Sequence, residues 1–316
     1  MKIVVLDAKT LGEDVSVEPL SEFGDLTVYP STKQNDVAER VKDAECIVTN
    51  KVKINESTVG EAKNLRLVAV TATGYDNIDT AYCKSRGIAV CNVRGYSTDA
   101  VTEVTVAMAL SLFTHLPEYN RFVKSGDYTA SGIANRLVPV YREIAGKTWG
   151  IVGYGNIGRS VATVAKALGC RVVVTSRSPK EDVENLPLDE LCKTADIISV
   201  HTPLTEETRG MLGTYEFSLM KPTAIVINVA RGAVLDEKAA ADALLENRIA
   251  GLATDVYSVE PLAPDSPYAR LFECDRACLT PHMAWGAYET RLRVVDEIKE
   301  NIRAFLRGEK RNRVEG

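Results

Sequence analysis

Three residues whose side chains bind anions or transfer protons follow short apolar segments in the second half of the chain. Arg231, Glu260 and His282 each come after a run that is typical of a buried β-strand. The three runs are Ala224–Asn228, Gly251–Thr254 and Cys278–Thr280. A guanidinium group binds carboxylates, and imidazole and carboxylate groups exchange protons near neutral pH. Because the carboxyl ends of parallel strands share one edge of a sheet, we expect these side chains to lie close together.

Taken one at a time, the same residues also fit structural roles. Arg231 could be a solvated surface charge, Glu260 could cap a loop, and His282 could be a buried histidine with satisfied hydrogen bonds. The functional interpretation depends on the three occurring together at strand ends. Only three histidines are present in the chain, and His115 lies in an apolar helical segment where a structural role is expected.

A glycine-rich turn follows an earlier predicted strand, Trp149–Val152, and opens a predicted helix, Arg159–Leu168. Its glycines permit a tight turn, the approach of a pyrophosphate to the backbone, and close packing of helix and strand. The first turn of the helix would offer free N–H groups and the positive end of its dipole. We therefore predict a dinucleotide site at Gly153, Gly155, Asn156, Ile157 and Gly158.

The next predicted strand, Arg171–Thr175, indicates which dinucleotide is bound. An NAD site usually has Asp or Glu about 20 residues after the glycine turn. Here Ser176, Arg177 and Ser178 occupy that place, and Ser176 is 18 residues after Gly158. An arginine there would attract a 2′-phosphate that a carboxylate would repel. We predict a preference for NADP(H) over NAD(H), with stacking of Arg177 on the adenine of NAD as the alternative.

At the level of motifs, the chain resembles the D-isomer-specific 2-hydroxyacid dehydrogenases. The resemblance rests on the glycine turn, the three segments around Arg231, Glu260 and His282, and the run Cys91–Thr98, and it covers essentially the whole chain. Within that family, the run Asn92–Thr98 and the end Thr280–Trp285 look most like the glycerate dehydrogenase/hydroxypyruvate reductase and glyoxylate reductase branches.

The resemblance implies a role for each of the three residues. Arg231 would bind the substrate carboxylate and polarise its carbonyl group. His282 would supply the proton during reduction, and Glu260 would orient His282 and favour its imidazolium form. The substrate would be a small 2-keto acid such as hydroxypyruvate or glyoxylate, or the corresponding 2-hydroxy acid. No metal is needed for this chemistry.

The resemblance also implies further binding residues. Asp255 would receive the nicotinamide carboxamide, and His201 would shape a loop beside the cofactor. Further cofactor contacts would come from Thr102, Pro203, Val229 and Ala230. Substrate contacts would come from the loop Thr73, Gly74 and Tyr75, whose backbone N–H groups would meet the substrate carboxylate opposite Arg231. The family usually has Asn where this chain has Asp76, so we assign that side chain no role.

Apolar runs alternate with helical segments along the whole chain, a pattern that predicts βαβ units. We expect an α/β protein with two doubly wound parallel-sheet domains, a Rossmann cofactor domain inserted into a flavodoxin-like substrate domain. The substrate domain would hold residues 1–97 and 287–316, the cofactor domain residues 98–286, and the site would lie between them. A long apolar helix is expected at 98–116, a less regular segment at 117–146, and a charged amphipathic helix at 287–313.

Composition limits the classes of protein that remain. The chain has 316 residues and a net charge of −5, which disfavours binding to nucleic acids or anionic membranes. No apolar run reaches the ~18 residues of a membrane span, and Asp7 comes too early for a secretory signal. The chain has seven cysteines, an odd number, and they are scattered along the sequence. This indicates a reducing compartment, so we expect a cytoplasmic protein.

The apolar helix at 98–116 suggests a homodimer built on the cofactor domain.

Two other functions fit parts of this pattern. A dinucleotide-sensing binding protein of the co-repressor type shares the fold, although a sensor has no need of a proton donor. Phosphoglycerate dehydrogenase is the second alternative, but the sequence has neither a regulatory segment after the last helix nor an extra basic cluster for a phosphate. Formate dehydrogenase is disfavoured because Glu260 occupies the position that partners the histidine.

Overall fold

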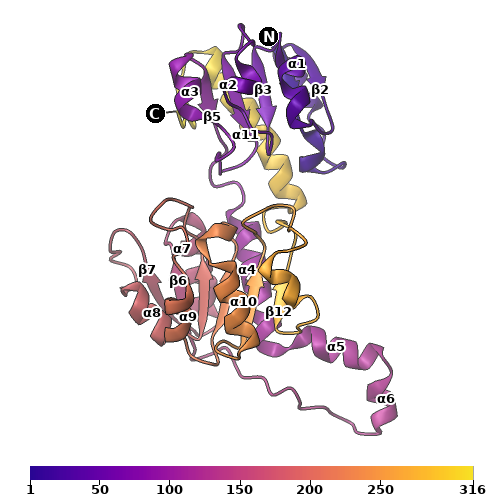
Figure 1. The fold of residues 1–316 in the computed structure, drawn as a ribbon, viewed down its shortest axis with the longest axis vertical. Coiled ribbons are helices and arrows are strands. Elements are labelled where there is room, and N and C mark those ends of the chain that lie inside the picture. The colour runs from indigo at the N-terminus through magenta and orange to yellow at the C-terminus, as the bar shows by residue number, and fades with distance from the viewer. Residues whose placement is uncertain (316) are drawn as a thin grey trace. The chain divides into compact units, whose positions relative to one another are not determined.

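The chain folds into two compact units, seen in a computed structural model that describes residues 1–315. One unit holds residues 1–97 and the chain from residue 286 onward, and the other holds residues 98–285. Each unit is built around one parallel sheet covered by helices (Figure 1). The predicted α/β class with two doubly wound sheets is confirmed.

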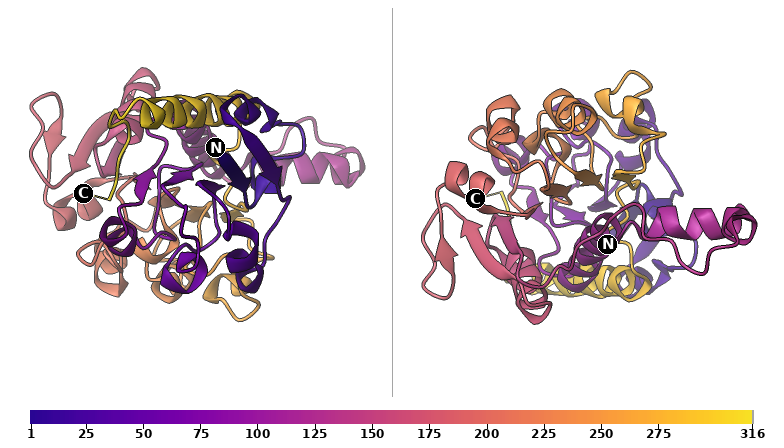
Figure 2. Two further views of the ribbon diagram at one scale, coloured as in Figure 1. Left: turned by 90° about the horizontal axis from the view of Figure 1, so that it is seen from above. Right: turned by 90° about the horizontal axis from the view of Figure 1, so that it is seen from below.

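The first unit contains a parallel sheet with the strand order β2-β1-β3-β4-β5, which is the flavodoxin-like order. Its strands are β1 (Lys2–Val5), β2 (Asp25–Val28), β3 (Cys46–Thr49), β4 (Leu67–Val70) and β5 (Ala89–Cys91). Its helices are α1 (Val37–Val41), α2 (Glu56–Val59), α3 (Thr80–Ser85) and α11 (Tyr288–Leu306). One face of the sheet packs on α1, α2 and α3 in a single apolar cluster, and α11 packs against β4 (Figure 2).

The second unit contains a parallel sheet with the order β12-β11-β10-β9-β6-β7-β8. Without the edge strand β12, the remaining six strands have the order of a Rossmann fold, in which β6 is the first strand. Its strands are β6 (Thr148–Val152), β7 (Arg171–Thr175), β8 (Glu184–Asn185), β9 (Ile197–Val200), β10 (Ile225–Asn228), β11 (Gly251–Thr254) and β12 (Ala277–Leu279). Its helices are α4 (Thr98–Thr114), α5 (Leu116–Lys124), α6 (Asp127–Ser131), α7 (Asn156–Ala167), α8 (Leu188–Thr194), α9 (Thr214–Leu219) and α10 (Glu237–Leu245).

Two apolar clusters fill the two faces of this second sheet. On one face α4 and α7 cover Trp149, Ile151 and Ile227, and on the other α8, α9 and α10 cover Val152, Val226 and their neighbours. Because both faces are covered, the strands are nearly continuous apolar runs, as the sequence predicted. The apolar side of α4 is therefore buried in its own unit, and its composition gives no argument for a dimer.

Three segments differ from the sequence prediction. The short strand β8 was not expected, because its two residues, Glu184 and Asn185, are polar. The stretch expected to be irregular at 117–146 contains α5 and α6, which project from the body of their unit (Figure 2). The last helix ends at Leu306, earlier than the predicted residue 313, and Gly308 adopts a left-handed φ of 73° just beyond it. The tail then returns to the sheet, where the N–H of Val314 donates to the carbonyl of Val90 at 3.0 Å.

Over residues 1–315, no single helix is both long and apolar enough to cross a membrane. The pair α4 and α5 meets the criterion only when taken together, by length and composition, and it is bent by 64° at the break.

The loops that follow β10 and β11 pack directly on each other at Gly232. A β-carbon at this position would lie 2.0 Å from the carbonyl carbon of Tyr257 and 2.3 Å from the nitrogen of Ser258. Both contacts are with backbone, which cannot rotate out of the way. Gly232 therefore lets the segment that carries Arg231 lie against the segment that leads to Glu260.

We expect Gly232→Ala to lower the free energy of unfolding by about 1–3 kcal/mol, as overpacking does. Urea unfolding followed by circular dichroism measures this change. Gly213→Ala is the matched control, because a β-carbon there has its nearest contacts at 3.5 Å and the φ angle is −113°. Equal stabilities of the two variants would contradict the close packing at Gly232.

Candidate active site

Strand register places the ends of β10, β11 and β12 side by side. Asn228 pairs with Thr254, and Thr254 pairs with Leu279, so the three parallel strands end at the same level. The loops that follow them carry Arg231, Glu260 and His282. The turn of the glycine motif follows β6 at the same edge of the sheet.

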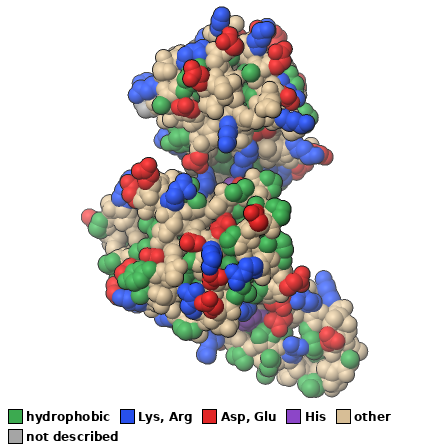
Figure 3. All heavy atoms as spheres, in the orientation of Figure 1, with side chains coloured by type: hydrophobic (Ala, Val, Ile, Leu, Met, Phe, Trp, Pro, Cys, Tyr) green, Lys and Arg blue, Asp and Glu red, His purple; other side chains and the backbone are tan. Residues whose placement is uncertain are grey.

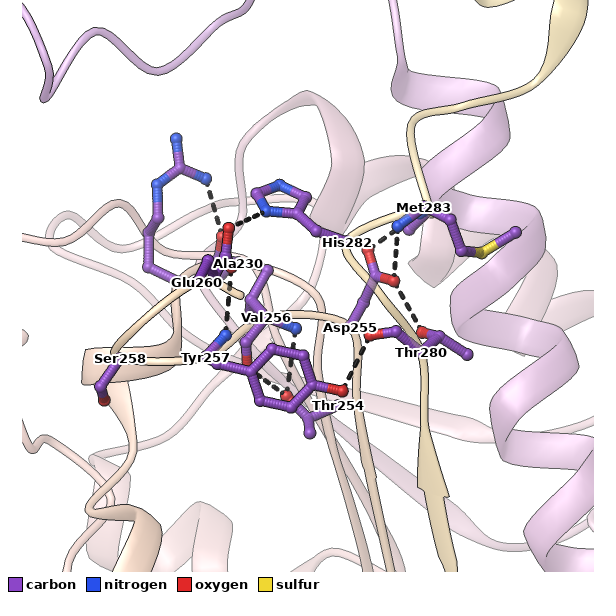
Figure 4. A network of polar contacts seen from close by, with 12 residues as sticks. Ala230, Thr254, Asp255, Val256, Tyr257, Ser258, Glu260, Thr280, His282 and Met283 are labelled. Carbon is purple, nitrogen blue, oxygen red and sulfur yellow. Dashed lines mark hydrogen bonds and ion pairs between the residues drawn. The ribbon is translucent and has the colours of Figure 1, made fainter. Parts of the chain in front are cut away.

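His282 and Glu260 are in direct contact. Nδ1 of His282 lies 2.7 Å from Oε2 of Glu260, although 22 residues separate them in the chain (Figure 4). The other carboxylate oxygen, Oε1, accepts a hydrogen bond from the N–H of Tyr257 at 3.1 Å. The two side chains are 23% and 30% exposed, so the pair is accessible to a small molecule. With Nδ1 held by Glu260, the Nε2 atom is the part of the ring left for proton exchange.

A buried carboxylate holds the turn on which His282 lies. Asp255 is 1% exposed, and it accepts hydrogen bonds from the hydroxyl of Thr280 at 2.6 Å and from the N–H groups of Met283 and Ala284, each at 2.8 Å (Figure 4). His282 has a φ of 55°, a left-handed conformation that residues with a β-carbon rarely adopt. The contacts on both sides of His282 therefore hold a backbone that would otherwise relax.

Arg231 lies shortly after β10 and directly precedes the 3-10 turn Gly232–Val234. Its Nη1 atom donates to the carbonyl of Ala230 at 2.8 Å, which ties the guanidinium group to its own loop. The buried side chain of Asn228 shapes this loop, because it donates to the carbonyl of Arg231 at 2.9 Å and accepts from the N–H of Ala230 at 3.1 Å. Arg231 is half-buried, and its loop is next to the one that carries Glu260.

The glycine turn has the shape that a pyrophosphate requires. A β-carbon at Gly153, where φ is 96°, would meet the backbone of His201 and Thr202 within 2.9 Å, and one at Gly158 would lie 2.2 Å from the carbonyl oxygen of Gly153. At Gly155 a β-carbon would meet nothing within 4 Å. Gly155 precedes the first residue of α7, and no side chain caps this helix end. The open side at Gly155, with Asn156 and Ile157 next to it, fits a bound phosphate group.

The segment after β7 is a tight polar turn. The hydroxyl of Ser176 donates to the carbonyl of Ser178 at 2.7 Å, and Nζ of Lys180 donates to the hydroxyl of Ser178 at 2.9 Å. Arg177 is exposed between the two serines. Lys180 was not among the residues expected from the sequence, although its position only two residues beyond Ser178 was a usable signal.

His201 lies behind the glycine turn as a half-buried residue whose ring nitrogen Nδ1 is buried. Burial lowers its pKa to about 3, so the ring is neutral at physiological pH. Its Nε2 lies 2.9 Å from the hydroxyl oxygen of Ser199. The indole N–H of Trp149 donates to the same oxygen at 2.9 Å. The N–H of His201 donates to the carbonyl of Val152, immediately before Gly153. These contacts support the loop-shaping role expected of His201.

The other predicted cofactor residues lie in the second unit. Pro203 follows β9 and accepts from the hydroxyl of Thr208 at 2.7 Å, while Val229 and Ala230 follow β10. Thr102 is buried in α4, where its hydroxyl donates to the carbonyl of Thr98 at 2.8 Å. The Thr102 hydroxyl therefore donates its hydrogen bond within its own helix.

The predicted substrate loop belongs to the first unit and follows β4. The hydroxyl of Thr73 donates to the carbonyl of Val93 at 2.8 Å, and Nδ2 of Asn92 donates to the carbonyl of Thr73 at 2.6 Å. Gly74 and Tyr75 come next, and Tyr75 is 38% exposed. Because the Thr73 side chain holds the loop, the groups left for a ligand are mainly those of the backbone.

Three residues that support the site were not expected from the sequence, namely Gly232, Tyr257 and Thr280. Gly232 directly follows the arginine, where a glycine often marks a close approach of two backbones. Tyr257 and Thr280 lie within three residues of Glu260 and His282. The supporting roles of Tyr257 and Thr280 could not be predicted from the amino-acid type, because a tyrosine or threonine beside a strand end is common in any parallel sheet.

Comparison with known proteins identifies the family of this chain. Residues 106–284 match the NAD binding domain of the D-isomer specific 2-hydroxyacid dehydrogenases. A glycerate dehydrogenase of Methylorubrum extorquens is 35% identical over 99% of both chains. A glyoxylate reductase of Korarchaeum cryptofilum is 38% identical over 86% of this chain and 83% of its own.

Among solved structures, the acyclic imino acid reductase Bsp5 in complex with NADPH and D-Arg superimposes with a TM-score of 0.88 at 27% identity, over 99% of this chain and all of that one. The resemblance inferred from the motifs is confirmed, and the protein binds a nicotinamide dinucleotide. This chain is a member of the D-isomer specific 2-hydroxyacid dehydrogenases, oxidoreductases that act on the CH–OH group of their donors.

Proposed function

We propose that this enzyme reduces small 2-keto acids, of the size of hydroxypyruvate or glyoxylate, to D-2-hydroxy acids and catalyses the reverse oxidation. The observation that carries the proposal is the 2.7 Å contact between Nδ1 of His282 and Glu260, at strand ends beside the one that bears Arg231. The names of the glycerate dehydrogenase and glyoxylate reductase that this chain resembles support the same substrate class.

Each of the three side chains has one proposed task. Arg231 binds the carboxylate of the keto acid and polarises the neighbouring carbonyl group through its forked N–H donors. His282 donates the proton from Nε2 to the carbonyl oxygen during reduction and takes it back during oxidation. Glu260 holds the ring by Nδ1 and stabilises the charged form. The nicotinamide ring, when bound, supplies or accepts the hydride.

Further residues are proposed to hold the two ligands. The loop of Gly74 and Tyr75, braced by Thr73, offers backbone N–H groups to the substrate carboxylate. The open side of the glycine turn, with Asn156 and Ile157 at the start of α7, holds the pyrophosphate of the dinucleotide. Asp255 uses three of the roughly four lone-pair positions of a carboxylate on the turn that carries His282, which leaves one for the nicotinamide carboxamide.

We expect His282→Asn and Arg231→Ala each to lower the rate of hydroxypyruvate and glyoxylate reduction by about 10²–10⁴-fold, through loss of the proton donor or of the carboxylate anchor. His115→Asn is the matched control for the histidine, because the φ angles of the two histidines are 52° and 55° and asparagine tolerates both. Oxidation of the reduced cofactor is followed by absorbance. Near-normal turnover in both variants, with the fold intact, would reject the mechanism.

The second proposal is a preference for NADP(H). After β7 the chain presents Ser176, Arg177, Ser178 and Lys180, and the amine of Lys180 already contacts the hydroxyl of Ser178. Two cations and two hydroxyls at this place suit a 2′-phosphate, to which charge-assisted hydrogen bonds form. The carboxylate of Asp182, four residues beyond Ser178, contacts Tyr154 and Arg159.

Arg177→Ala is expected to lower kcat/KM for NADPH by about 10–100-fold and to leave kcat/KM for NADH within about 2-fold, because a charge-assisted hydrogen bond is lost with the phosphate only. Arg171→Ala is the control at the other end of β7, where Arg171 pairs with Glu184. A wild-type enzyme that clearly prefers NADH would refute the proposal, whatever the variant does.

The third proposal is a homodimer formed through the second unit. Exposed apolar side chains gather on the projecting segment from α5 to residue 141, and apolar patches of this kind mark interfaces between proteins. The residues more than half exposed are Leu116, Val123, Ile133, Leu137, Val138, Val140 and Tyr141. Figure 3 shows hydrophobic side chains at the surface of this unit.

We expect the double variant Leu137→Glu, Val140→Glu to run as a 34.5 kDa monomer and the wild type at twice that mass, measured by light scattering after gel filtration. Charges at the centre of an apolar interface oppose association. Leu306→Glu changes a leucine that is 50% exposed in the first unit and should remain dimeric. A monomeric wild type would exclude the dimer.

The seven cysteines are all free thiols, at positions 46, 83, 91, 170, 192, 274 and 278. Free thiols persist in reducing compartments. This supports the cytoplasm as the proposed location.

A further inference from the structure

Thr280 takes part in several of the hydrogen bonds that hold the turn of His282. It follows the last residue of β12, and His282 lies two residues further on. The hydroxyl of Thr280 donates to Oδ1 of Asp255 at 2.6 Å. Its carbonyl accepts both the phenol O–H of Tyr257 at 2.9 Å and the N–H of His282 at 3.1 Å. Thr280 thus links the loop after β11 to the turn that carries the histidine (Figure 4).

The turn at His282 needs such support because its backbone is strained. The φ of 55° is disfavoured for a histidine, and no glycine or asparagine relieves it. Asp255 holds the chain on both sides of the strained residue, by the Thr280 hydroxyl before it and by the N–H groups of Met283 and Ala284 after it. Of these donors, the hydroxyl is the one that a substitution removes without altering the backbone.

The direction of these hydrogen bonds is set by chemistry. An ionised carboxylate only accepts, so the Thr280 hydroxyl is the donor. Burial, followed by the nearby charges of Asp255 and Glu260, raises the pKa of Tyr257 to about 12. Its phenol therefore stays protonated and keeps donating to the Thr280 carbonyl over the pH range in which a dehydrogenase is assayed. The same tyrosine donates its backbone N–H to Glu260, the partner of His282.

We propose that Thr280 is a positioning residue for the reaction: through Asp255, its hydroxyl holds the left-handed turn at His282 and thereby keeps the imidazole ring against Glu260. Thr280 acts through the histidine and touches neither substrate nor cofactor. The inference rests on the proposed function of His282 as the proton donor.

The test compares Thr280→Val, which replaces the hydroxyl by a methyl group of similar size, with Thr280→Ser, which retains the hydroxyl. Thr105→Val is the matched control. Thr105 is fully buried in α4, and its hydroxyl donates to the carbonyl of Val101 at 2.6 Å, so the same substitution removes one buried hydrogen bond elsewhere in the unit. Thermal unfolding is measured for all three variants, because a lost hydrogen bond lowers stability at either site.

For Thr280→Val we expect kcat for keto acid reduction to fall about 10-fold while the KM for the keto acid changes by less than about 3-fold, because the proton donor is misplaced and the carboxylate anchor Arg231 is not. Thr280→Ser should regain most of the lost rate. Thr105→Val should keep the wild-type kcat even where its melting temperature falls as far as that of Thr280→Val.

A second measurement does not depend on turnover. The chain has three histidines, so the imidazole signals in a nuclear magnetic resonance spectrum are few enough to assign. The His282 signals should move in Thr280→Val and stay in place in Thr280→Ser and Thr105→Val. Wild-type kcat and unmoved His282 signals in Thr280→Val would overturn the inference. A wild-type enzyme that reduces no 2-keto acid would instead overturn the proposed function.

Discussion

The arrangement of this site depends on one buried carboxylate. Asp255 follows β11, the strand next to the edge strand β12, is almost completely buried, and accepts hydrogen bonds from two main-chain N–H groups and one hydroxyl in the segment after β12. A buried charge is costly unless it is fully hydrogen-bonded, and these three donors compensate it. The same donors fix the turn that contains His282. The stabilisation of the carboxylate and the placement of the histidine are therefore one interaction, and neither can change without the other.

A second constraint joins the neighbouring loop to this one. Gly232 allows the backbone after β10 to lie against Tyr257 and Ser258, closer than any side chain would permit. The carboxylate of Glu237, at the start of α10, adds a hydrogen bond from the N–H of Ser258 at 2.6 Å. The loops that carry Arg231, Glu260 and His282 are thus connected in series, by backbone packing at Gly232 and by the hydrogen bonds of the Asp255 and Tyr257 side chains to the segment after β12. Contacts of this kind resist the small displacements to which proton transfer is sensitive.

The parallel sheet explains why these loops are available at one edge. All seven strands of the sheet in the second unit are parallel and end at the same edge, and the glycine turn follows β6, next to the point where the strand order reverses. In open α/β sheets, ligands bind at such a point. The tight approach of Gly153 to His201 and of Gly158 to Gly153 leaves the outer side of Gly155 open. The proposed cofactor site and the proposed acid–base pair therefore arise from one topology.

The sequence alone was sufficient for the order and type of most elements. Apolar β-branched runs identified every strand of both sheets except β8, because strands covered on both faces must be apolar throughout, whereas the edge strand β8 is the polar pair Glu184–Asn185. Motif spacing was sufficient for the family, because glycines at fixed offsets have a steric meaning that does not depend on distant residues. The sequence did not predict the two helices between 116 and 131. It also did not predict the end of α11, because that end is set by a glycine and by pairing of the tail with β5.

Tertiary structure decided which polar groups meet. Nothing local distinguishes Thr280 or Tyr257 from other polar residues at strand ends, and Asp255 reaches its donors across 25 to 29 residues of chain. Likewise, the apolar surface of α4 had suggested a dimer, yet it is covered within its own unit. A side chain finds its hydrogen-bond partner through strand register and loop conformation, which depend on the packing of the whole sheet. A sequence specifies the groups that can pair, but the fold determines which of them come within 3 Å.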